Sequence, residues 1–285
     1  MEIVFNDVSA DFQIGPIRSP LVLHAINMKI KSGSFTAVVG HTGAGKSSLL
    51  KAMNGLLIPH EGRVLVGNMI IDRNINKKDL KGIRKKVGMV FQFPESQLFA
   101  ETVEKDICFG PTNFGVSKNQ AKEIARNVIK MVGLEVDILT KSPFSISGGQ
   151  KRRVALAGVL AMKPDILILD EPGAGLDPHG KKEILTLLKN WNQNHGLTIV
   201  LVTHDMDDVA LYTDDIIIME KGKIVVHDET RKVFSNNELL NRYSLDVPDA
   251  RRLQLKIEDE IGVNFPYICL SVDELADALI EADVV

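Results

Sequence analysis

The residue pattern with the clearest chemistry begins at Gly40 and reads Gly-His-Thr-Gly-Ala-Gly-Lys-Ser-Ser. It fits the phosphate-binding loop G-x-x-x-x-G-K-[ST] and lies between an apolar, β-rich run, residues 35–39, and a helical run, residues 48–53. This context disfavours the alternative, a chance match at a glycine-rich turn. Lys46 is placed to reach the β- and γ-phosphates of a nucleotide, and the Ser47 hydroxyl to ligate a bridging Mg²⁺. The nucleotide-binding residues expected here are Gly40, His41, Thr42, Gly43, Ala44, Gly45, Lys46, Ser47 and Ser48.

Two carboxylates follow a strand-like run further along the chain. Residues 165–169 predict a strand buried on both faces, which delivers Asp170 and Glu171 to its carboxyl end. Adjacent carboxylates there are costly unless they meet a cation or a proton; the alternative is a simple strand-end turn. Residues 197–203 repeat the pattern and deliver His204. A strand-end histidine is usually structural, but this one ends a strand of the same sheet.

Three further candidates carry weaker signals, and each has an ordinary structural alternative. Gln92 ends a strand beside a turn-forming proline and can present its amide to a metal or a water. Ser147 begins a helix with small residues before it, which makes a second anion-binding candidate. Phe12 ends the first expected strand, where its ring can stack on a purine or pack in the core.

The elements that must position these residues follow from the apolar spacing. Strands are expected over 2–12, 23–30 and 86–91, hairpins over 63–71 and 216–226, and C-terminal helices over 248–261 and 272–282. Strand signals disappear between about 98 and 163, which predicts a helical insertion.

The composition indicates a reduced, cytosolic protein. The 285 residues can bury a core without disulfides, and Cys108 and Cys269 are isolated and lack metal-ligand spacing. No secretory signal is expected, and no apolar run approaches the roughly 18 to 20 residues of a spanning helix. A formal net charge of -3 argues against broad nucleic-acid binding, and the basic run 77–86 is expected to be a solvated helix face.

In their order and spacing, these motifs resemble those of the ATPase subunits of ABC transporters. The resemblance covers residues 1 to about 240 and rests on Gly40 to Ser47, Gln92, Ser147 to Gln150, Asp170 with Glu171, Leu176 with Asp177, and His204. Residues 91–99, 109–116 and 157–161 resemble energy-coupling-factor ATPases, most closely the second of that module's two ATPases. The implied α/β fold has a RecA-like P-loop NTPase core, an N-terminal antiparallel β subdomain and a helical ABC-specific insertion. The implied domains are an ATPase domain at 1–240, with its helical part at about 98–163, and a C-terminal helical extension at 241–285.

The resemblance also implies roles within the site. Phe12 would stack the adenine, and Lys46 would hold the phosphates. The Mg²⁺ ligands would be Ser47, Gln92 and Asp170. Glu171 would act as the general base or orient the attacking water, with Gln92 and His204 as further catalytic residues. Ile146 and Gly173 depart from the family's usual leucine and its usual threonine or serine, and neither removes a reacting group.

A partner chain is implied as well, because two such ATPases face head to tail. The residues that would contact the partner's nucleotide are Ser147, Gly148, Gly149 and Gln150, and Asp177 would couple the two sites. The second ATPase is expected to be a paralogue, and a second copy of this chain is the alternative. A transmembrane scaffold and a separate membrane substrate-binding subunit complete the implied importer, which would take up vitamins, other micronutrients or metal ions. The chain itself would lie peripherally on the cytoplasmic side of the cell membrane.

The scaffold contact is expected at the glutamine loop. Phe93, Leu98 and Phe99 put large apolar side chains there, and exposed ones would favour a partner. The alternative is that all three belong to the core.

Two other functions are compatible with a nucleotide-binding chain. ABC ATPases that act on DNA or the ribosome carry coiled-coil insertions or two cassettes, whereas this sequence has one cassette and no long heptad run. A purely regulatory nucleotide-binding module would not need Glu171, Gln92 and His204 together.

Overall fold

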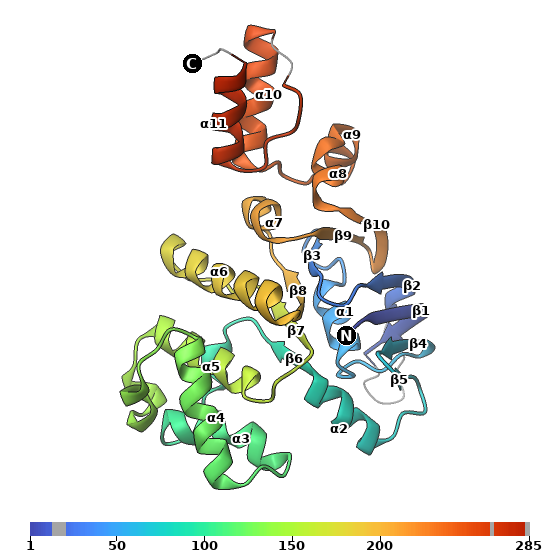
Figure 1. The fold of residues 1–285 in the computed structure, drawn as a ribbon. Helices are drawn as coiled ribbons and strands as arrows, with labels where there is room; N and C mark the ends of the chain where they lie inside the picture. Colours follow the sequence, from blue (N-terminus) through green and yellow to red (C-terminus); the bar gives the residue numbers. More distant parts are fainter. Residues whose placement is uncertain (13–20, 263–264, 283–285) are drawn as a thin grey trace.

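The structure is a computed structural model that describes residues 1–12, 21–262 and 265–282. Two sheets lie face to face with α1 (Lys46–Met53) between them, and further helices surround them (Figure 1). The first sheet is antiparallel, in the order β2-β1-β4-β5, with strands β1 (Ile3–Asp11), β2 (Leu21–Ile30), β4 (Glu61–Val66) and β5 (Met69–Ile71). This is the N-terminal antiparallel subdomain that the sequence predicts.

The second sheet has six strands in the order β10-β9-β3-β8-β7-β6. Its strands are β3 (Phe35–Val39), β6 (Val87–Val90), β7 (Ile166–Asp170), β8 (Thr198–Val202), β9 (Asp215–Glu220) and β10 (Lys223–Glu229). All neighbours are parallel except β9 and β10, which form a hairpin. Every residue of β3 and β8 is buried, as expected for parallel strands covered on both faces.

The carboxyl ends of the parallel strands bring the predicted site residues to one edge of this sheet. The phosphate loop follows β3, Gln92 follows β6, Asp170 ends β7 and His204 follows β8. In a sheet of this kind, ligands bind at the carboxyl ends of the strands.

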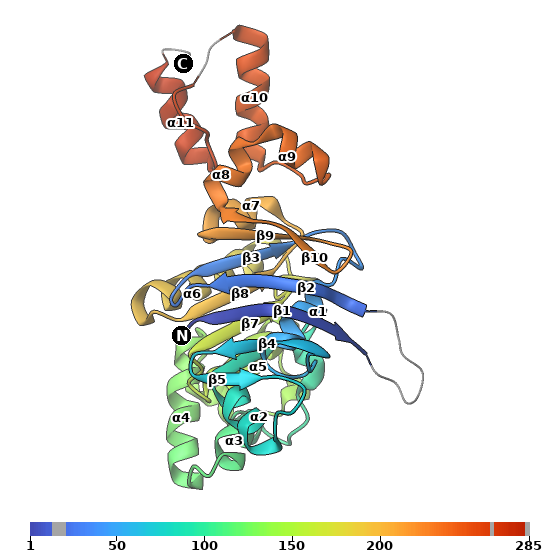
Figure 2. The same cartoon turned by 90° about the vertical axis from the view of Figure 1, so that its right-hand side faces the viewer.

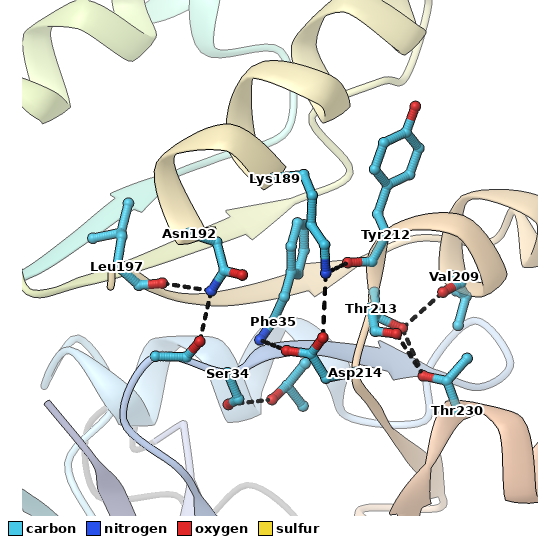
Figure 3. A network of polar contacts seen from close by, with 12 residues as sticks. Ser34, Phe35, Lys189, Asn192, Leu197, Val209, Tyr212, Thr213, Asp214 and Thr230 are labelled. Carbon is cyan, nitrogen blue, oxygen red and sulfur yellow. Dashed lines mark hydrogen bonds and ion pairs between the residues drawn. The ribbon is translucent and has the colours of Figure 1, made fainter. Parts of the chain in front are cut away.

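A polar network fixes the opposite edge of the sheet (Figure 3). The Asp214 carboxylate accepts from the Phe35 backbone N–H at 2.8 Å and from Lys189 Nζ at 3.2 Å. The Asn192 amide donates to the backbone oxygens of Gly33 and Leu197, at 2.7 and 2.8 Å. Because Lys189 and Asn192 belong to α6 (Pro178–His195), this helix is tied to the amino ends of the strands, away from the site.

The segment between β6 and β7 is helical, as the sequence predicts. It contains η1 (Pro94–Gln97), α3 (Val103–Asn113), α4 (Lys118–Met131), η2 (Val136–Thr140), η3 (Pro143–Ser145) and α5 (Gly148–Leu160). Its apolar faces share a core with one face of the parallel sheet and with α6. The longest of these helices has 14 residues, so the insertion is no coiled coil. The basic run forms α2 (Lys77–Lys86), in which Ile83 is the buried residue, which confirms a solvated helix face.

The C-terminal helices lie beyond the β9–β10 hairpin, at the end of the molecule opposite the helical insertion (Figure 2). They are α8 (Thr230–Ser235), α9 (Asn237–Arg242), α10 (Asp249–Ile261) and α11 (Val272–Glu281), and they follow α7 (Met206–Tyr212) and the hairpin. The α10–α11 pair has a small core of its own around Cys269 and is joined to α8 by Arg231, which donates to the Ile268 carbonyl at 2.7 Å. Among the helices of the described residues, none is long and apolar enough to cross a membrane.

Candidate active site

The phosphate loop is shaped by close packing against β9. Gly40 has φ +139°, and a Cβ there would lie 2.3 Å from the carbonyl oxygen of Met219. Both the backbone angle and the contact therefore require glycine at the first position of the motif. The loop ends where α1 begins at Lys46, so the amino end of this helix points at the loop.

Lys46 is the first residue of α1, directly after the loop, and is buried. Its Nζ donates to the carbonyl oxygens of Gly40 and His41, at 2.6 and 3.0 Å. Burial lowers the pKa of Lys46, and the nearby carboxylates of Glu171 and Asp170 oppose this effect. The ammonium group thus donates to the loop and lies within the electrostatic influence of the acidic pair, and its contact with phosphates stays a prediction.

Glu171 lies between side chains from two other strand ends. One carboxylate oxygen accepts from Gln92 Nε2 at 3.0 Å, and the other lies 2.6 Å from His204 Nε2. Its backbone is in the left-handed region, with φ +51°, a conformation that costs about 1–3 kcal/mol for a residue with a side chain. The Glu171 N–H donates to the carbonyl of Val202 at 3.0 Å and holds this conformation. Glu171 is therefore in direct contact with the other two residues predicted as catalytic.

Lys46 and the three residues predicted as catalytic line one hollow of about 810 Å³. Its walls include Lys46, Ser47, Gln92, Glu171 and His204, together with residues that the sequence did not single out: Leu21, Val22 and His24 of β2, and Lys221 with Gly222 of the β9–β10 turn.

Gly222 joins the phosphate loop to the antiparallel sheet. Its N–H donates to the Ala44 carbonyl, and its carbonyl accepts from the His24 N–H, both at 2.9 Å. With φ +76° and a Cβ that would lie 2.7 Å from the Val22 carbonyl, this position also requires glycine. A glycine at a hairpin turn was visible in the sequence, but its neighbours in space were not.

The predicted metal ligands are hard oxygen donors of the kind that Mg²⁺ takes. Ser47 and Gln92 line the hollow, and the Gln92 amide nitrogen faces Glu171. Asp170 lies at the end of β7 and is not among the lining residues, although its charge acts on Lys46. The donor set therefore fits a magnesium ion, and its binding here stays a prediction.

Phe12 lies outside this hollow. It is 39% exposed, and the Lys51 ammonium lies 5.5 Å from the centre of its ring. It lines a separate hollow of about 580 Å³ with residues 56–60 and Arg73. Phe12 is thus not among the residues that line the hollow at Lys46, and adenine stacking stays a prediction.

The second anion-binding candidate lines another hollow, of about 560 Å³. Ser147 caps α5: its hydroxyl accepts from the Gln150 N–H, and its own N–H donates to the Gln150 side chain. Asp177 caps α6 by accepting from the Gly180 N–H at 3.0 Å, a bond that lowers the Asp177 pKa. Both caps line this hollow with Gly148 and Gly149, and within the described chain it shares no residue with the hollow at Lys46.

Lys181 accounts for the unusual glycine after the carboxylates. Its ammonium pairs with Asp205 and Asp208, which follow His204, and so ties α6 to this segment. A Cβ at Gly173 would lie 2.8 Å from Lys181 Cγ. The threonine or serine expected at this position would have to displace the lysine.

The apolar residues of the glutamine loop separate into core and surface. Leu98 is 8% exposed and packs in the core of the helical insertion, so the expectation that it faces a partner is wrong. Phe99 is 60% exposed, and its ring makes an edge contact with Phe109, with ring centres 4.9 Å apart. Phe93 is also exposed. An exposed aromatic group therefore remains beside the loop.

The chain is similar to known proteins over nearly its whole length. A family model described as ABC transporter matches residues 23–174. The energy-coupling factor transporter ATP-binding protein EcfA2 of Geobacillus kaustophilus is 50% identical over 98% of this chain and 96% of its own length, and that of Enterococcus faecalis is 49% identical over 99% and 97%.

Solved structures show the same fold. cbiO1 from Clostridium perfringens, part of the ABC transporter complex cbiONQ, aligns with a TM-score of 0.74 and 36% identity over 90% of this chain and 98% of its own. The ATP-binding cassette MJ0796, in a dimeric post-hydrolysis state bound to ADP and phosphate, aligns with a TM-score of 0.71 and 29% identity over 80% and 99%. The matched family, the identities and the geometry of the site agree: the chain belongs to the ABC transporter ATPases, among the energy-coupling factor transporter ATP-binding proteins.

Proposed function

We propose that this chain binds ATP at the phosphate loop and hydrolyses it to power an energy-coupling factor importer for vitamins, other micronutrients or metal ions. The observation that carries this proposal is the position of Glu171. Its carboxylate contacts Gln92 and His204 and lines the same hollow as Lys46. A carboxylate held opposite a phosphate-binding lysine is suited to orient and deprotonate a water that attacks the γ-phosphate.

The chain's own residues supply most of what the reaction needs. The backbone N–H groups of the loop and the Lys46 ammonium bind the phosphates, and they stabilise the charge that develops during transfer. Glu171 takes a proton from the attacking water, while Gln92 and His204 hold its carboxylate in place. When bound by Ser47, Gln92 and Asp170, Mg²⁺ would neutralise charge on the phosphate oxygens.

We further propose that the second hollow completes the site of another ATPase. In support, Ser147 and Asp177 line a hollow that shares no described residue with the one at Lys46. The similar cassette MJ0796 is described as dimeric. A head-to-tail pair would place the Ser147 turn of each chain against the nucleotide of the other. ATP binding would then close the pair, and hydrolysis would open it. Because the similar relatives are named EcfA2, we propose a paralogue as the second ATPase.

The link to transport is proposed at the exposed aromatic group of the glutamine loop. Phe93, Phe99 and Phe109 are exposed and adjoin the loop that begins at Gln92. A transmembrane scaffold that docks there would place the chain peripherally on the cytoplasmic face of the cell membrane, with a separate membrane subunit binding the substrate.

The proposed function is tested by Glu171→Gln in the purified complex. The amide keeps the size of the side chain but cannot accept the proton, so turnover should fall at least ~10²-fold, while ATP affinity stays within about threefold. Glu61→Gln, an exposed carboxylate in the antiparallel sheet, is the control and should retain full turnover. Near-normal hydrolysis by Glu171→Gln would remove Glu171 from its proposed role.

A further inference from the structure

Arg152 lies at the junction of three segments of the chain. It belongs to α5 and is 4% exposed. Its Nε and Nη2 donate to the two carboxylate oxygens of Glu95, at 3.1 and 2.9 Å. Its Nη1 donates to the carbonyl oxygens of Pro172 and Ala174, at 3.2 and 2.7 Å. All three nitrogens of the guanidinium therefore hold partners in other segments.

Each of these segments carries a different part of the proposed site. The carboxylate partner lies in the loop that begins at Gln92. The two carbonyls belong to the link between Glu171 and Asp177. Arg152 itself lies in the first turns of the helix that Ser147 caps. No motif of the sequence marks this residue, because its partners are distant in the chain.

We propose that Arg152 is a positioning residue that makes the Ser147 turn, the glutamine loop and the Glu171–Asp177 link move as one unit. This inference rests on the proposed function. If a partner's nucleotide draws the Ser147 turn toward it, the guanidinium carries the displacement to the glutamine loop and to the Asp177 cap. If a scaffold moves the glutamine loop, the same contacts carry that displacement back to the two caps.

The chemistry of the contact favours arginine over a simple cation. A planar guanidinium can bind a carboxylate with two parallel bonds and still donate to carbonyls on its other side, whereas a lysine ammonium cannot reproduce this geometry. Burial alone would raise the pKa of Glu95, but the hydrogen bonds to its carboxylate and the charges of Arg152 and Lys151 together lower it. Glu95 and Arg152 therefore form an ion pair. The short hydrogen bonds of the guanidinium hold the three segments together.

A pair that only stabilised the fold would behave differently from a pair that positions the site. Loss of a stabilising pair lowers the fraction of folded chain, but leaves the turnover of each folded chain unchanged. Loss of a positioning pair lowers turnover per folded chain without changing ATP affinity at the chain's own loop, because Arg152 does not line that hollow.

The test measures two quantities in the assembled complex: the affinity of a fluorescent ATP analogue, and kcat per chain that binds it. For Arg152→Met we expect affinity within about threefold of the parent and kcat at least ~10-fold lower. Arg152→Lys should recover part of the loss. Glu95→Gln should lower kcat by at least ~3-fold, and this milder variant tests the contact even if Arg152→Met fails to fold. In the double variant, kcat should fall no further than in Arg152→Met, because both changes remove the same contact.

The matched control is Arg251→Met, since Arg251 is also a buried arginine paired with a glutamate, Glu258, but lies in the C-terminal helices. It should lower the thermal midpoint and leave kcat per binding chain unchanged. The inference is overturned if Arg152→Met keeps kcat within twofold, if the two single losses multiply in the double variant, or if Arg251→Met loses as much kcat as Arg152→Met. Failure of the proposed function would be seen in a different result, namely retained turnover in Glu171→Gln.

Discussion

Replacement of Gly40 by alanine tests whether the approach of β9 fixes the phosphate loop. The added Cβ would lie 2.3 Å from the Met219 carbonyl oxygen and 3.2 Å from its carbon. A carbon and an oxygen that are not bonded normally stay at least about 3.3 Å apart. The gap between the loop and β9 must therefore widen by roughly 1 Å, although β3 and β9 are paired directly beside it through Val39 and Ile218.

The free-energy cost of this substitution has two parts. Forcing an atom into a packed site costs about 1–3 kcal/mol. Holding alanine at φ +139° costs about 1–3 kcal/mol more, because side chains rarely adopt that region. We therefore expect Gly40→Ala to lower the free energy of unfolding by about 2–6 kcal/mol. ATP affinity should fall as well, since the Gly40 carbonyl is one of the two acceptors that hold Lys46.

The assay is urea unfolding followed by linear extrapolation, and Gly43→Ala is the matched control. Gly43 lies in the same loop with φ +82°, but a Cβ there would meet no atom within 4 Å. Gly43→Ala should lower the free energy of unfolding only by the cost of the backbone angle, about 1–2 kcal/mol. If Gly40→Ala is no less stable than Gly43→Ala, the contact with Met219 does not constrain the loop and the reasoning is wrong.

Three further predictions concern the Ser147 turn, the buried carboxylate of Asp208 and the glutamine loop. Gly149→Asp has open space for its side chain, so this variant should fold and bind ATP at its own loop. Its turnover in the complex should fall at least ~10²-fold, because the new carboxylate would meet the partner's phosphates. Loss of ATP binding by the isolated chain would contradict the assignment to a partner. Burial raises the pKa of Asp208 from 3.8 to about 6, so its stabilising contribution is complete below about pH 4 and is lost as the pH rises through 6. Asp208→Asn should therefore raise the free energy of unfolding by up to about 3 kcal/mol at pH 8 and leave it unchanged at pH 4. An equal increase at both pH values would show another cause. Leu98→Asp should lower the free energy of unfolding by at least about 3 kcal/mol, because Leu98 is buried. Phe99→Asp should change stability little and prevent co-purification with the scaffold. Equal thermal midpoints for the two variants would refute the assignment of Leu98 to the core and Phe99 to the surface.

The sheet edge that carries the site could be predicted because it depends on local patterns. Runs such as 165–169 and 197–203 are apolar without alternation, which is the mark of parallel strands covered on both faces, and the residue after each run must lie at the same edge. The helix starts at Lys46 and Ser147 likewise carry their own signals, a glycine-rich loop and a capping serine.

What could not be predicted depends on contacts between distant segments. Leu98 and Phe99 are adjacent apolar residues in a short irregular stretch, so no periodicity assigns one to the core and the other to the surface. Gly222 was visible as a hairpin turn, but its bonds to Ala44 and His24 join segments that are far apart in the chain. Arg152 sits on a helix start where an exposed arginine would be the ordinary expectation, and it is buried because carbonyls and a carboxylate from two other segments surround it.

The same contacts bear on the proposed pairing with a second chain. The hollow at Lys46 already holds its cation and the Glu171 carboxylate, and the strained backbone of Glu171 is fixed by the protein before any substrate arrives. The Ser147 turn, which is proposed to complete such a site, lines the other hollow. A motion of α5 away from the Glu171–Asp177 link would cost the buried Arg152 both carbonyl partners. Because a buried guanidinium without partners is costly, Arg152 holds the Ser147 turn to the Glu171–Asp177 link, and we propose that this turn meets the nucleotide of a partner.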